Sequence, residues 1–352
     1  MSLTPPSSAG GTSEPAPSAE SGNVEQSYAA LRESAVVVDR SHRLRLTLDG
    51  PRAAETLAGL VTSDVLSLKP GAGQYGAALS PKGKIIADVR IFARDDGFVV
   101  DAPPRAAEGL RTMFRKFVNP RGAKVTDRSS EWRSIAIGGP KAAMIAAGVS
   151  GVAADELRAL DAYGHVAGGA TRNVILVASI PVIDLPAFEL IVPTDSYSQV
   201  HAAAVNAGAF AGDADAWEIA RMEAGYPEWG VDIDDSTIPQ EANFDGLQAI
   251  SYTKGCYVGQ ETVARVHFRG HVNRHLRGLI LSRGAAVPRG AAIADENGKP
   301  VGDVRSVARS PRLGWIAMAM IRREVLPPAR VSVSWEDGNT TAQVVELPFP
   351  EP

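Results

Sequence analysis

Residues 43–61 read RLRLTLDGPRAAETLAGLV, and this stretch contains a strand, a turn and a helix in succession. Leucines at alternate positions predict a strand with one apolar face: Leu44, Leu46 and Leu48. Gly50-Pro51 then turns the chain, since proline is well tolerated in the first turn of a helix. The apolar residues that follow recur at helical spacing: Leu57, Leu60 and Val61.

A similar joint occurs a second time in the chain. Residues 48–54 read LDGPRAA, and residues 137–143 read IGGPKAA after the apolar run Ser134–Ile137. The match indicates one strand–turn–helix unit used twice, although chance also produces matches of this length. Between the two joints, Ile85–Ala93 alternates as a strand that places Asp88 and Arg90 on one face, either in solvent or in a polar pocket.

The rest of the chain mixes helices and strands and then changes texture. Residues 110–118 carry apolar side chains at helical spacing, Phe188–Val192 is a predicted strand, and a helix follows to about Ala207. After about residue 275, short apolar runs alternate with turns at 296–300 and 336–339, which is typical of a small all-β domain. The sequence therefore predicts an α+β protein with a separate C-terminal β domain.

Composition limits the class of protein and the kinds of site. The 352 residues are 45% hydrophobic and 22% charged, as in ordinary globular proteins, and the net charge of −4 argues against a general nucleic-acid binder. A single cysteine excludes an internal disulfide and a conventional zinc or iron–sulfur site built from the chain's own thiols. The first 27 residues resemble neither a signal nor a transit peptide, and no stretch is long enough for a membrane helix. We expect a cytoplasmic protein.

The single cysteine, Cys256, lies in the unusual segment KGCYVGQE at residues 254–261. Glycines on both sides allow close approach of the backbone or a positive φ. Lys254 can lower the pKa of the thiol, and the thiolate is the reactive form. A buried cysteine in a tight turn is the alternative, but the polar neighbours favour a functional thiol.

Three stretches together resemble one known family. They are VTSDVLSLKPGAGQYGAALSPKGKIIADVRIF at 61–92, EIARMEAGYPEWGVDIDDSTIPQEANF at 218–244 and ISYTKGCYVGQETVARVHFRG at 250–270. The chain is similar, from about residue 28 to about 345, to the YgfZ-type folate-binding proteins, which are relatives of the glycine cleavage T-protein (aminomethyltransferase). The KGCYVGQE segment is specific to the YgfZ type, whose eukaryotic counterparts are mitochondrial iron–sulfur assembly factors.

This resemblance implies a fold and a function. The fold is a ring of three domains around a central hole, two with antiparallel sheets and one a C-terminal β-barrel. We expect a disordered tail at 1–27, a folate-binding region of two interleaved α+β subdomains at 28–270 and the barrel at 271–352. The implied function is binding of tetrahydrofolate, or a one-carbon-substituted folate, to support assembly or repair of iron–sulfur client proteins, including enzymes that thiolate tRNA.

The resemblance also implies site residues. Glu189 matches the glutamate that recognises the pterin ring, where a carboxylate can accept two N–H bonds. Arg221 matches a folate-pocket arginine, and Tyr75 is expected to line the same pocket. Asp88 matches the working carboxylate of the T-protein, but the preceding acid of that pair is Ala87 here, which weakens the case for aminomethyl transfer.

The KGCYVGQE turn is expected to face the same hole, with Gln260 and Glu261 fixing the loop beside the folate. The thiolate of Cys256 can then ligate or relay a metal cluster, accept a sulfur species or bond transiently to a client. Lys254, Cys256 and Asp88 are therefore the candidate catalytic residues.

Residues 265–277 are rich in arginine and histidine against an acidic background. Such a cluster can contact a folate polyglutamate tail or tRNA phosphates, or can simply be solvated. Helical spacing would bring His267, His271 and His275 together for a metal, but the alternation over 263–269 favours extended chain. Two rival functions follow: a tetrahydrofolate-dependent aminomethyl or one-carbon transferase, and a tRNA-binding module.

Overall fold

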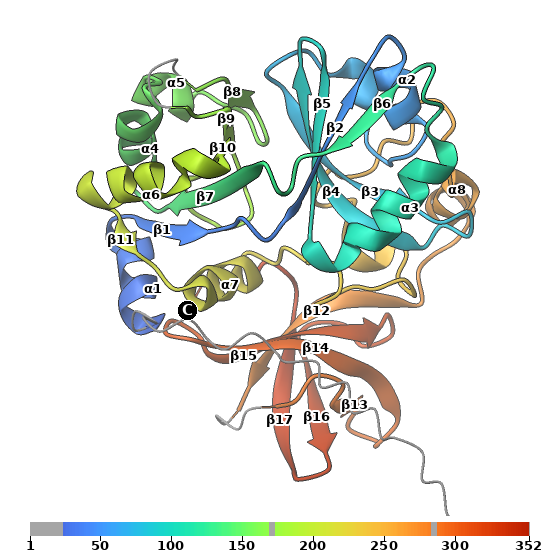
Figure 1. Ribbon diagram of the computed structural model, residues 1–352. Helices are drawn as coiled ribbons and strands as arrows, with labels where there is room; N and C mark the ends of the chain where they lie inside the picture. The colour runs from blue at the N-terminus through green and yellow to red at the C-terminus, as the bar shows by residue number, and fades with distance from the viewer. Residues whose placement is uncertain (1–23, 169–172, 283–286, 352) are drawn as a thin grey trace, which may run out of the picture.

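The computed structural model describes residues 24–168, 173–282 and 287–351, and within these residues the strands form three sheets. The sheets lie in three lobes arranged as a triangle, with the C-terminal barrel at the bottom of the view (Figure 1). The class is α+β with mainly antiparallel pairing, as predicted. Of the predicted tail, residues 1–23 lie outside the described residues, and 24–27 begin helix α1 (Val24–Glu33).

The first lobe is a sheet with strand order β3–β4–β5–β2–β6. Its strands are β2 (Leu44–Asp49), β3 (Gly73–Leu79), β4 (Ile85–Arg94), β5 (Gly97–Ala102) and β6 (Lys124–Asp127). The β2 leucines pack against helices α2 (Ala53–Ala58) and α3 (Ala107–Phe117), which confirms the predicted strand, turn and helix. The helix ends at Ala58, however, so Leu60 and Val61 of the predicted stripe join the same apolar cluster from outside it. Residues of the opposite parity, including Arg45 and Arg90, lie on the other face of this sheet.

The second lobe is a sheet with strand order β11–β1–β7–β10–β9–β8. Its strands are β1 (Val36–Asp39), β7 (Trp132–Gly138), β8 (His165–Val166), β9 (Leu176–Ser179), β10 (Ala187–Pro193) and β11 (Phe210–Ala211). Helices α4 (Ala142–Ser150), α5 (Ala154–Arg158) and α6 (Tyr197–Asn206) contribute to the apolar cluster with this sheet. The chain therefore enters this sheet at β1, builds the first lobe, and returns at β7.

The C-terminal lobe is a closed barrel with strand order β12–β15–β14–β13–β16–β17. Its strands are β12 (Arg274–Leu281), β13 (Ala292–Ala294), β14 (Pro300–Ser310), β15 (Gly314–Arg322), β16 (Ala329–Trp335) and β17 (Gly338–Val345). The predicted turns fall between β13 and β14 and between β16 and β17. Helix α7 (Ala214–Glu223) lies between the second lobe and the barrel and packs with α1 through Tyr28 and Ile219 (Figure 1).

One local prediction is wrong. Residues 263–269 were expected to be extended, but they belong to helix α8 (Gln260–Arg269). The alternating residues are mostly charged and give no apolar face, whereas Val263 and Val266 lie three positions apart, which suits a helix. His271 follows the helix and His275 lies in β12, so the histidines do not share a helical face.

Candidate functional site

A row of charged residues crosses the inner face of the first lobe. Strand register places Arg45 opposite Asp101, and Asp101 opposite Arg90. Asp101 accepts hydrogen bonds from Arg43 Nε at 2.6 Å and Arg90 Nε at 2.8 Å. All of these side chains are buried, so each charge needs a partner of opposite sign.

Glu189 joins this row from β10 of the second lobe. Its Oε2 lies 2.7 Å from Arg90 Nη1, and its Oε1 lies 3.1 Å from Arg45 Nη2 and 2.9 Å from Ser134 Oγ. Burial opposes ionisation, but Arg90 and Arg45 outweigh it and hold the pKa of Glu189 well below its usual range. The carboxylate predicted to read a pterin ring is therefore ion-paired to two arginines, and its buried Oε2 receives no hydrogen bond from the described residues.

Asp88 lies on the same face of β4, two residues before Arg90. Its Oδ2 accepts from Tyr75 Oη and its Oδ1 from the Trp229 backbone N–H, both at 3.1 Å. Burial raises the pKa of Asp88 to about 6, partly offset by Arg43. A carboxyl with this pKa is half ionised near pH 6 and mostly ionised at neutral pH.

Tyr75 brings a group of aromatic rings to Asp88. Its ring centroid lies 6.0 Å from Tyr163, 5.9 Å from Tyr226 and 5.2 Å from Phe244. Burial raises the pKa of Tyr75 well above its ordinary value, so its phenol stays neutral and donates to Asp88. Tyr75 and Asp88, both predicted site residues, are thus in direct contact.

Arg221 of α7 is tied to its own neighbourhood. Its Nε donates to Glu218 at 2.7 Å, its Nη1 donates to Asp232 at 2.7 Å, and Nη1 also contacts the Tyr226 carbonyl. Burial opposes the charge, but Asp232 and Glu218 raise the pKa of Arg221. This predicted pocket arginine therefore anchors the 226–232 turn.

That turn supplies a carboxylate that the sequence did not single out, Glu228. Its Oε2 lies 3.9 Å from both Arg40 Nη2 and Arg43 Nη1, and its side chain is 14% exposed. Glu228 contributes to raising the pKa of Asp88, although burial is the larger cause. The only sequence signal was an acid inside the quoted 218–244 stretch. We call Arg43, Arg45, Asp88, Arg90, Asp101, Glu189 and Glu228 the central charged group.

The KGCYVGQE segment, residues 254–261, forms a separate site that we call the thiol loop. Cys256 is exposed. Lys254 does not face the thiol as its hydrogen-bond partner: its Nζ donates to the carbonyls of Ala58 at 2.7 Å, Val61 at 2.7 Å and Ser63 at 2.8 Å. An ammonium has three donors, so Lys254 is fully used in anchoring the loop to the C-terminal end of α2.

Burial lowers the pKa of Lys254 to about 8, while the three carbonyls favour the ammonium. Gly259 has φ 83°, and a Cβ there would lie 2.6 Å from the Ser80 carbonyl oxygen, so glycine is required. Gln260 Oε1 accepts from the Tyr257 backbone N–H at 3.3 Å, which closes the turn, and Glu261 is exposed. The loop is firmly held, and it presents the thiol outward.

The structure brings the predicted residues together in two groups. Asp88 and Tyr75 are hydrogen-bonded, and Glu189 is ion-paired to Arg90, their neighbour in the central charged group. Lys254, Gln260 and Glu261 belong to the thiol loop. Among the described residues, no hydrogen bond or ion pair joins one group to the other. A common cavity for the thiol and the carboxylates stays a prediction.

Some residues of the basic cluster at 265–277 are paired with carboxylates, and others are exposed. Arg274 Nε donates to Glu241 at 3.0 Å, and Arg277 pairs with Glu346 at 2.6 Å. Arg265 and Arg269 are exposed on α8. His267 stacks on Tyr252 with ring centroids 3.6 Å apart. The free part of the cluster is therefore the exposed face of α8.

Residues 24–168, 173–282 and 287–351 hold no group of three or more His, Cys, Asp or Glu side chains suited to a metal ion. No helix within them is long and apolar enough to cross a membrane.

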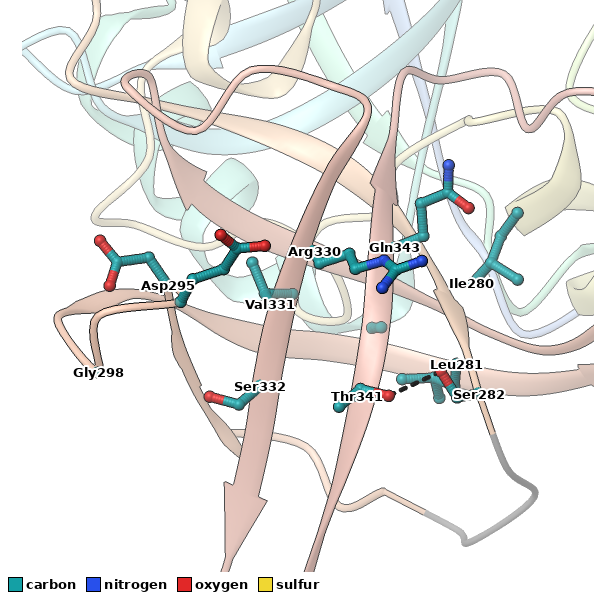
Figure 2. Close-up of a pocket in the computed structure, with 12 residues that line it drawn as sticks. Ile280, Leu281, Ser282, Asp295, Gly298, Arg330, Val331, Ser332, Thr341 and Gln343 are labelled. Carbon is teal, nitrogen blue, oxygen red and sulfur yellow. Dashed lines mark hydrogen bonds between the residues drawn. The ribbon is translucent and has the colours of Figure 1, made fainter.

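A depression of about 790 Å³ lies on the barrel wall, lined by β12, β16 and β17 (Figure 2). Two of its hydroxyl groups bond within the fold: Thr341 Oγ1 donates to Ser282 Oγ at 2.8 Å, and Ser332 Oγ donates to the Ala294 carbonyl at 3.3 Å. Asp295 accepts from backbone N–H groups of its own turn. None of the predicted site residues lines this depression.

Comparison with known families decides the membership of the chain. The model described as "GCVT N-terminal domain" matches residues 14–251, and that described as "Glycine cleavage T-protein C-terminal barrel domain" matches residues 274–350. The chain belongs to the glycine cleavage T-protein family. The barrel match begins at Arg274, where β12 begins.

Individual members of the T-protein family are similar to this protein along nearly the whole chain. A relative named "Aminomethyltransferase" from Nostoc sp. strain PCC 7120 is 28% identical over 336 residues, and the match covers 93% of this chain and 87% of that protein. A second relative of the same name, from Halothermothrix orenii, is 27% identical over 334 residues, and the match covers 93% of this chain and 91% of that protein. The crystal structure of glycine cleavage system aminomethyltransferase T from Bartonella henselae superposes with a TM-score of 0.81 at 21% identity, covering 93% of this chain and 90% of that one. The T-protein fold is thereby established.

Proposed function

We propose that this protein is a YgfZ-type member of the T-protein family that binds a reduced folate and supports assembly or repair of iron–sulfur proteins, including tRNA-thiolating enzymes. The observation that carries the proposal is the exposure of Cys256 on an anchored loop. A cysteine kept only for packing is normally buried. The KGCYVGQE segment, the specific part of the resemblance, is the segment that holds this thiol.

The central charged group fits a reduced folate in part. Tyr226 is half-buried beside this group and offers ring surface to a pterin, whereas Tyr75 and Tyr163 are packed in the core. Glu189 Oε1 accepts from Arg45 and Ser134, whereas Oε2 is ion-paired to Arg90 but receives no hydrogen bond from the described residues, so it can accept one from a ligand. When bound, the folate would supply a carrier for a one-carbon unit, and the protein's residues would bind and orient it.

On the thiol loop, Cys256 is the residue that reacts and Lys254 is the residue that positions it. Cys256 supplies the sulfur, since a thiolate is the form that ligates a metal or bonds transiently to a client. Lys254 acts as a positioning residue because its three donors are committed to the 58–63 segment. Exposure lets a macromolecular client reach the sulfur directly.

Complementation tests this proposal. In a strain that lacks the gene, the wild-type protein is expected to restore the activity of iron–sulfur enzymes, and Cys256→Ala is expected to restore little or none at equal abundance. Cys256→Ser tests whether a hydroxyl of similar size suffices. Full rescue by Cys256→Ala would remove the thiol from the function.

A second candidate is a tetrahydrofolate-dependent aminomethyl or one-carbon transferase. The names of the relatives favour it, and so does Asp88, because a pKa of about 6 suits a general base near neutral pH. Against it, Ala87 replaces the adjacent acid, and both oxygens of Asp88 already accept hydrogen bonds. Turnover of tetrahydrofolate with a panel of N-methyl and aminomethyl donors, lost in Asp88→Asn, would favour the transferase.

A weak tRNA contact is a third candidate, through the exposed α8 arginines. Arg265 and Arg269 carry the part of the predicted basic cluster that is open to solvent. Phosphate contacts release counterions, so affinity for tRNA should fall steeply as salt rises. The effect is large between roughly 50 and 200 mM salt. If tRNA does not bind, or if its affinity stays constant over this range, the candidate is removed.

A further inference from the structure

A pocket of about 430 Å³ lies on the first lobe, next to the thiol loop. Three parts of the chain line it: residues 52–60 in and around α2, residues 117–122 at and after the end of α3, and Val258 of the thiol loop. Main-chain bonds hold these parts together, since Arg52 N–H donates to the Gly122 carbonyl at 2.9 Å and Val258 N–H donates to the Gly59 carbonyl at 3.0 Å. The volume falls in the range of small-molecule sites.

Two arginines of this pocket have no partner of opposite charge. The bond from Arg52 to Gly122 places Arg52 beside the turn that carries Arg121, and both side chains are exposed. Among the described residues, neither guanidinium forms an ion pair or a hydrogen bond, and no acidic residue lines the pocket. By contrast, Arg94 and Arg111 of the same lobe pair with aspartates at 2.7 Å and 2.6 Å. Two unpaired positive charges on neighbouring segments repel each other, and an anion that contacts both relieves the repulsion.

The rest of the lining offers apolar surface and further donors. Phe117 is 41% exposed, and Leu60 and Val258 line the same pocket. Lys116 Nζ lies 5.2 Å from the centroid of the Phe117 ring, which adds a third positive charge on this side. Asn119 Oδ1 accepts from the main-chain N–H two residues on, at 3.0 Å, so its amide N–H groups remain as donors. A small molecule with an acidic group and an apolar part matches this lining.

The thiol of Cys256 belongs to a segment that is tied to the pocket on both sides. Before the cysteine, Lys254 Nζ donates to carbonyls at 58–63, and after it Val258 N–H donates to the Gly59 carbonyl. Cys256 is two residues from Val258, and successive Cα atoms are 3.8 Å apart, so their Cα atoms lie within about 7.6 Å of each other. A ligand in the pocket is therefore near the exposed cysteine.

We propose that this pocket binds a small molecule that carries a phosphate or carboxylate group, held by Arg52 and Arg121, with its apolar part on Phe117 and Leu60. A guanidinium offers two parallel N–H donors to either kind of oxyanion. The pocket is separate from the central charged group, and the inference does not depend on the proposed folate binding. One consequence is that the pocket favours anionic over neutral compounds among those that react with Cys256.

Calorimetric titration of the full chain with phenyl phosphate and, separately, with benzoate tests the pocket and distinguishes the two oxyanions. At least one of them is expected to bind, and Arg52→Gln and Arg121→Gln are each expected to weaken that binding by roughly tenfold, because a hydrogen bond to a charged group is lost. Arg309→Gln, at an exposed arginine of β14, is the matched control and should leave the affinity unchanged. The pocket variants lose no protein hydrogen bond from a side chain, so their melting temperatures should equal that of the wild type.

Thiol–disulfide exchange measures the same charge preference at Cys256. The thiolate attacks one sulfur of a disulfide reagent, a mixed disulfide forms, and the other half leaves as a thiolate. Anionic dithiobis(nitrobenzoate) should react several times faster with the wild type than with Arg52→Gln or Arg121→Gln. Neutral dithiodipyridine should react at the same rate with all three proteins.

Two results would overturn the inference. One is that neither phenyl phosphate nor benzoate binds the wild type, and the other is that the wild type and both arginine variants bind them equally. Equal slowing of both disulfide reagents in the variants would overturn the charge preference, because the effect would then come from a shifted loop. None of these results bears on folate binding or on rescue by Cys256, so the inference and the proposed function fail separately.

Discussion

The central charged group and the thiol loop hold polar residues in opposite ways. In the centre, Glu189 is buried and its oxygens are bonded to arginines from the other lobe. In the thiol loop, Lys254 is bonded to backbone carbonyls, and the neighbouring Cys256 is left exposed. In the first region the polar groups join two sheets, and in the second one lysine anchors a loop on which the sulfur is exposed.

The central charged group therefore has a structural role although its residue types are those of a catalytic site, whereas the thiol loop exposes a group that can react. Buried ion pairs hold a fold in register, and removing one partner leaves an unpaired charge. An exposed thiol contributes little to folding and is available to partners. The variants below address this contrast, in order of their expected effect on stability.

The largest effect is expected for Glu189→Gln. The change removes the negative charge that Arg45 and Arg90 share, and breaking a buried pair costs about 3–5 kcal/mol. Urea denaturation should show this loss in the free energy of unfolding. The matched control is Glu131→Gln, in an exposed pair with Arg128, where the loss should be below about 1 kcal/mol. Similar small losses in both variants would mean that Glu189 does not hold the two sheets together.

Lys254→Ala should rank second. It removes the ammonium that satisfies the carbonyls of Ala58, Val61 and Ser63, at a cost of about 2–3 kcal/mol. Lys82→Ala, at an exposed lysine of the same lobe, is the control and should be nearly neutral. If Lys254 served only the chemistry of the thiol, its replacement would leave the unfolding midpoint where the wild type has it.

Asp88→Asn should act through pH. The folded pKa of Asp88 is raised to about 6, so protonation favours the folded state and the stabilisation is lost as pH rises from about 4 through 6. Asparagine does not titrate, so between pH 4 and pH 8 the free energy of unfolding of the variant should rise by roughly 1–3 kcal/mol relative to that of the wild type. Thermal unfolding measured across this range checks it. Parallel curves for the two proteins would show that Asp88 is not perturbed by burial.

The smallest effect on stability is expected for Cys256→Ala. Replacing an exposed side chain changes the free energy of unfolding by no more than about 0.5 kcal/mol. Denaturation midpoints of the variant and the wild type should therefore coincide. A loss of several kcal/mol would place the sulfur in the core and would make any loss of rescue a folding effect.

The sequence predicted the elements that depend on local pattern. The alternating leucines of 44–48 and the helical stripe of 110–118 lie where expected, because each segment buries one apolar face. The same periodicity indicated that Asp88 and Arg90 share a face, which they do. It misjudged 263–269, where charged alternation imitated a strand and the spacing of Val263 and Val266 was overlooked.

The partners across the two lobes were beyond the reach of the sequence. Nothing in the chain order shows that Arg45 and Glu189 meet, since 144 positions separate them. Lys254 was expected beside the thiol as its neighbour in sequence, but its Nζ lies with the carbonyls at 58–63.

The most direct test of the exposed, ready thiol is alkylation of the folded protein. Wild-type protein is treated with iodoacetamide in native buffer, and mass spectrometry counts the added groups, with Cys256→Ala as the blank. The structure predicts that Cys256 is alkylated in the folded state, without denaturant. Modification that appears only when denaturant unfolds the protein would contradict the account, because the sulfur would then be enclosed.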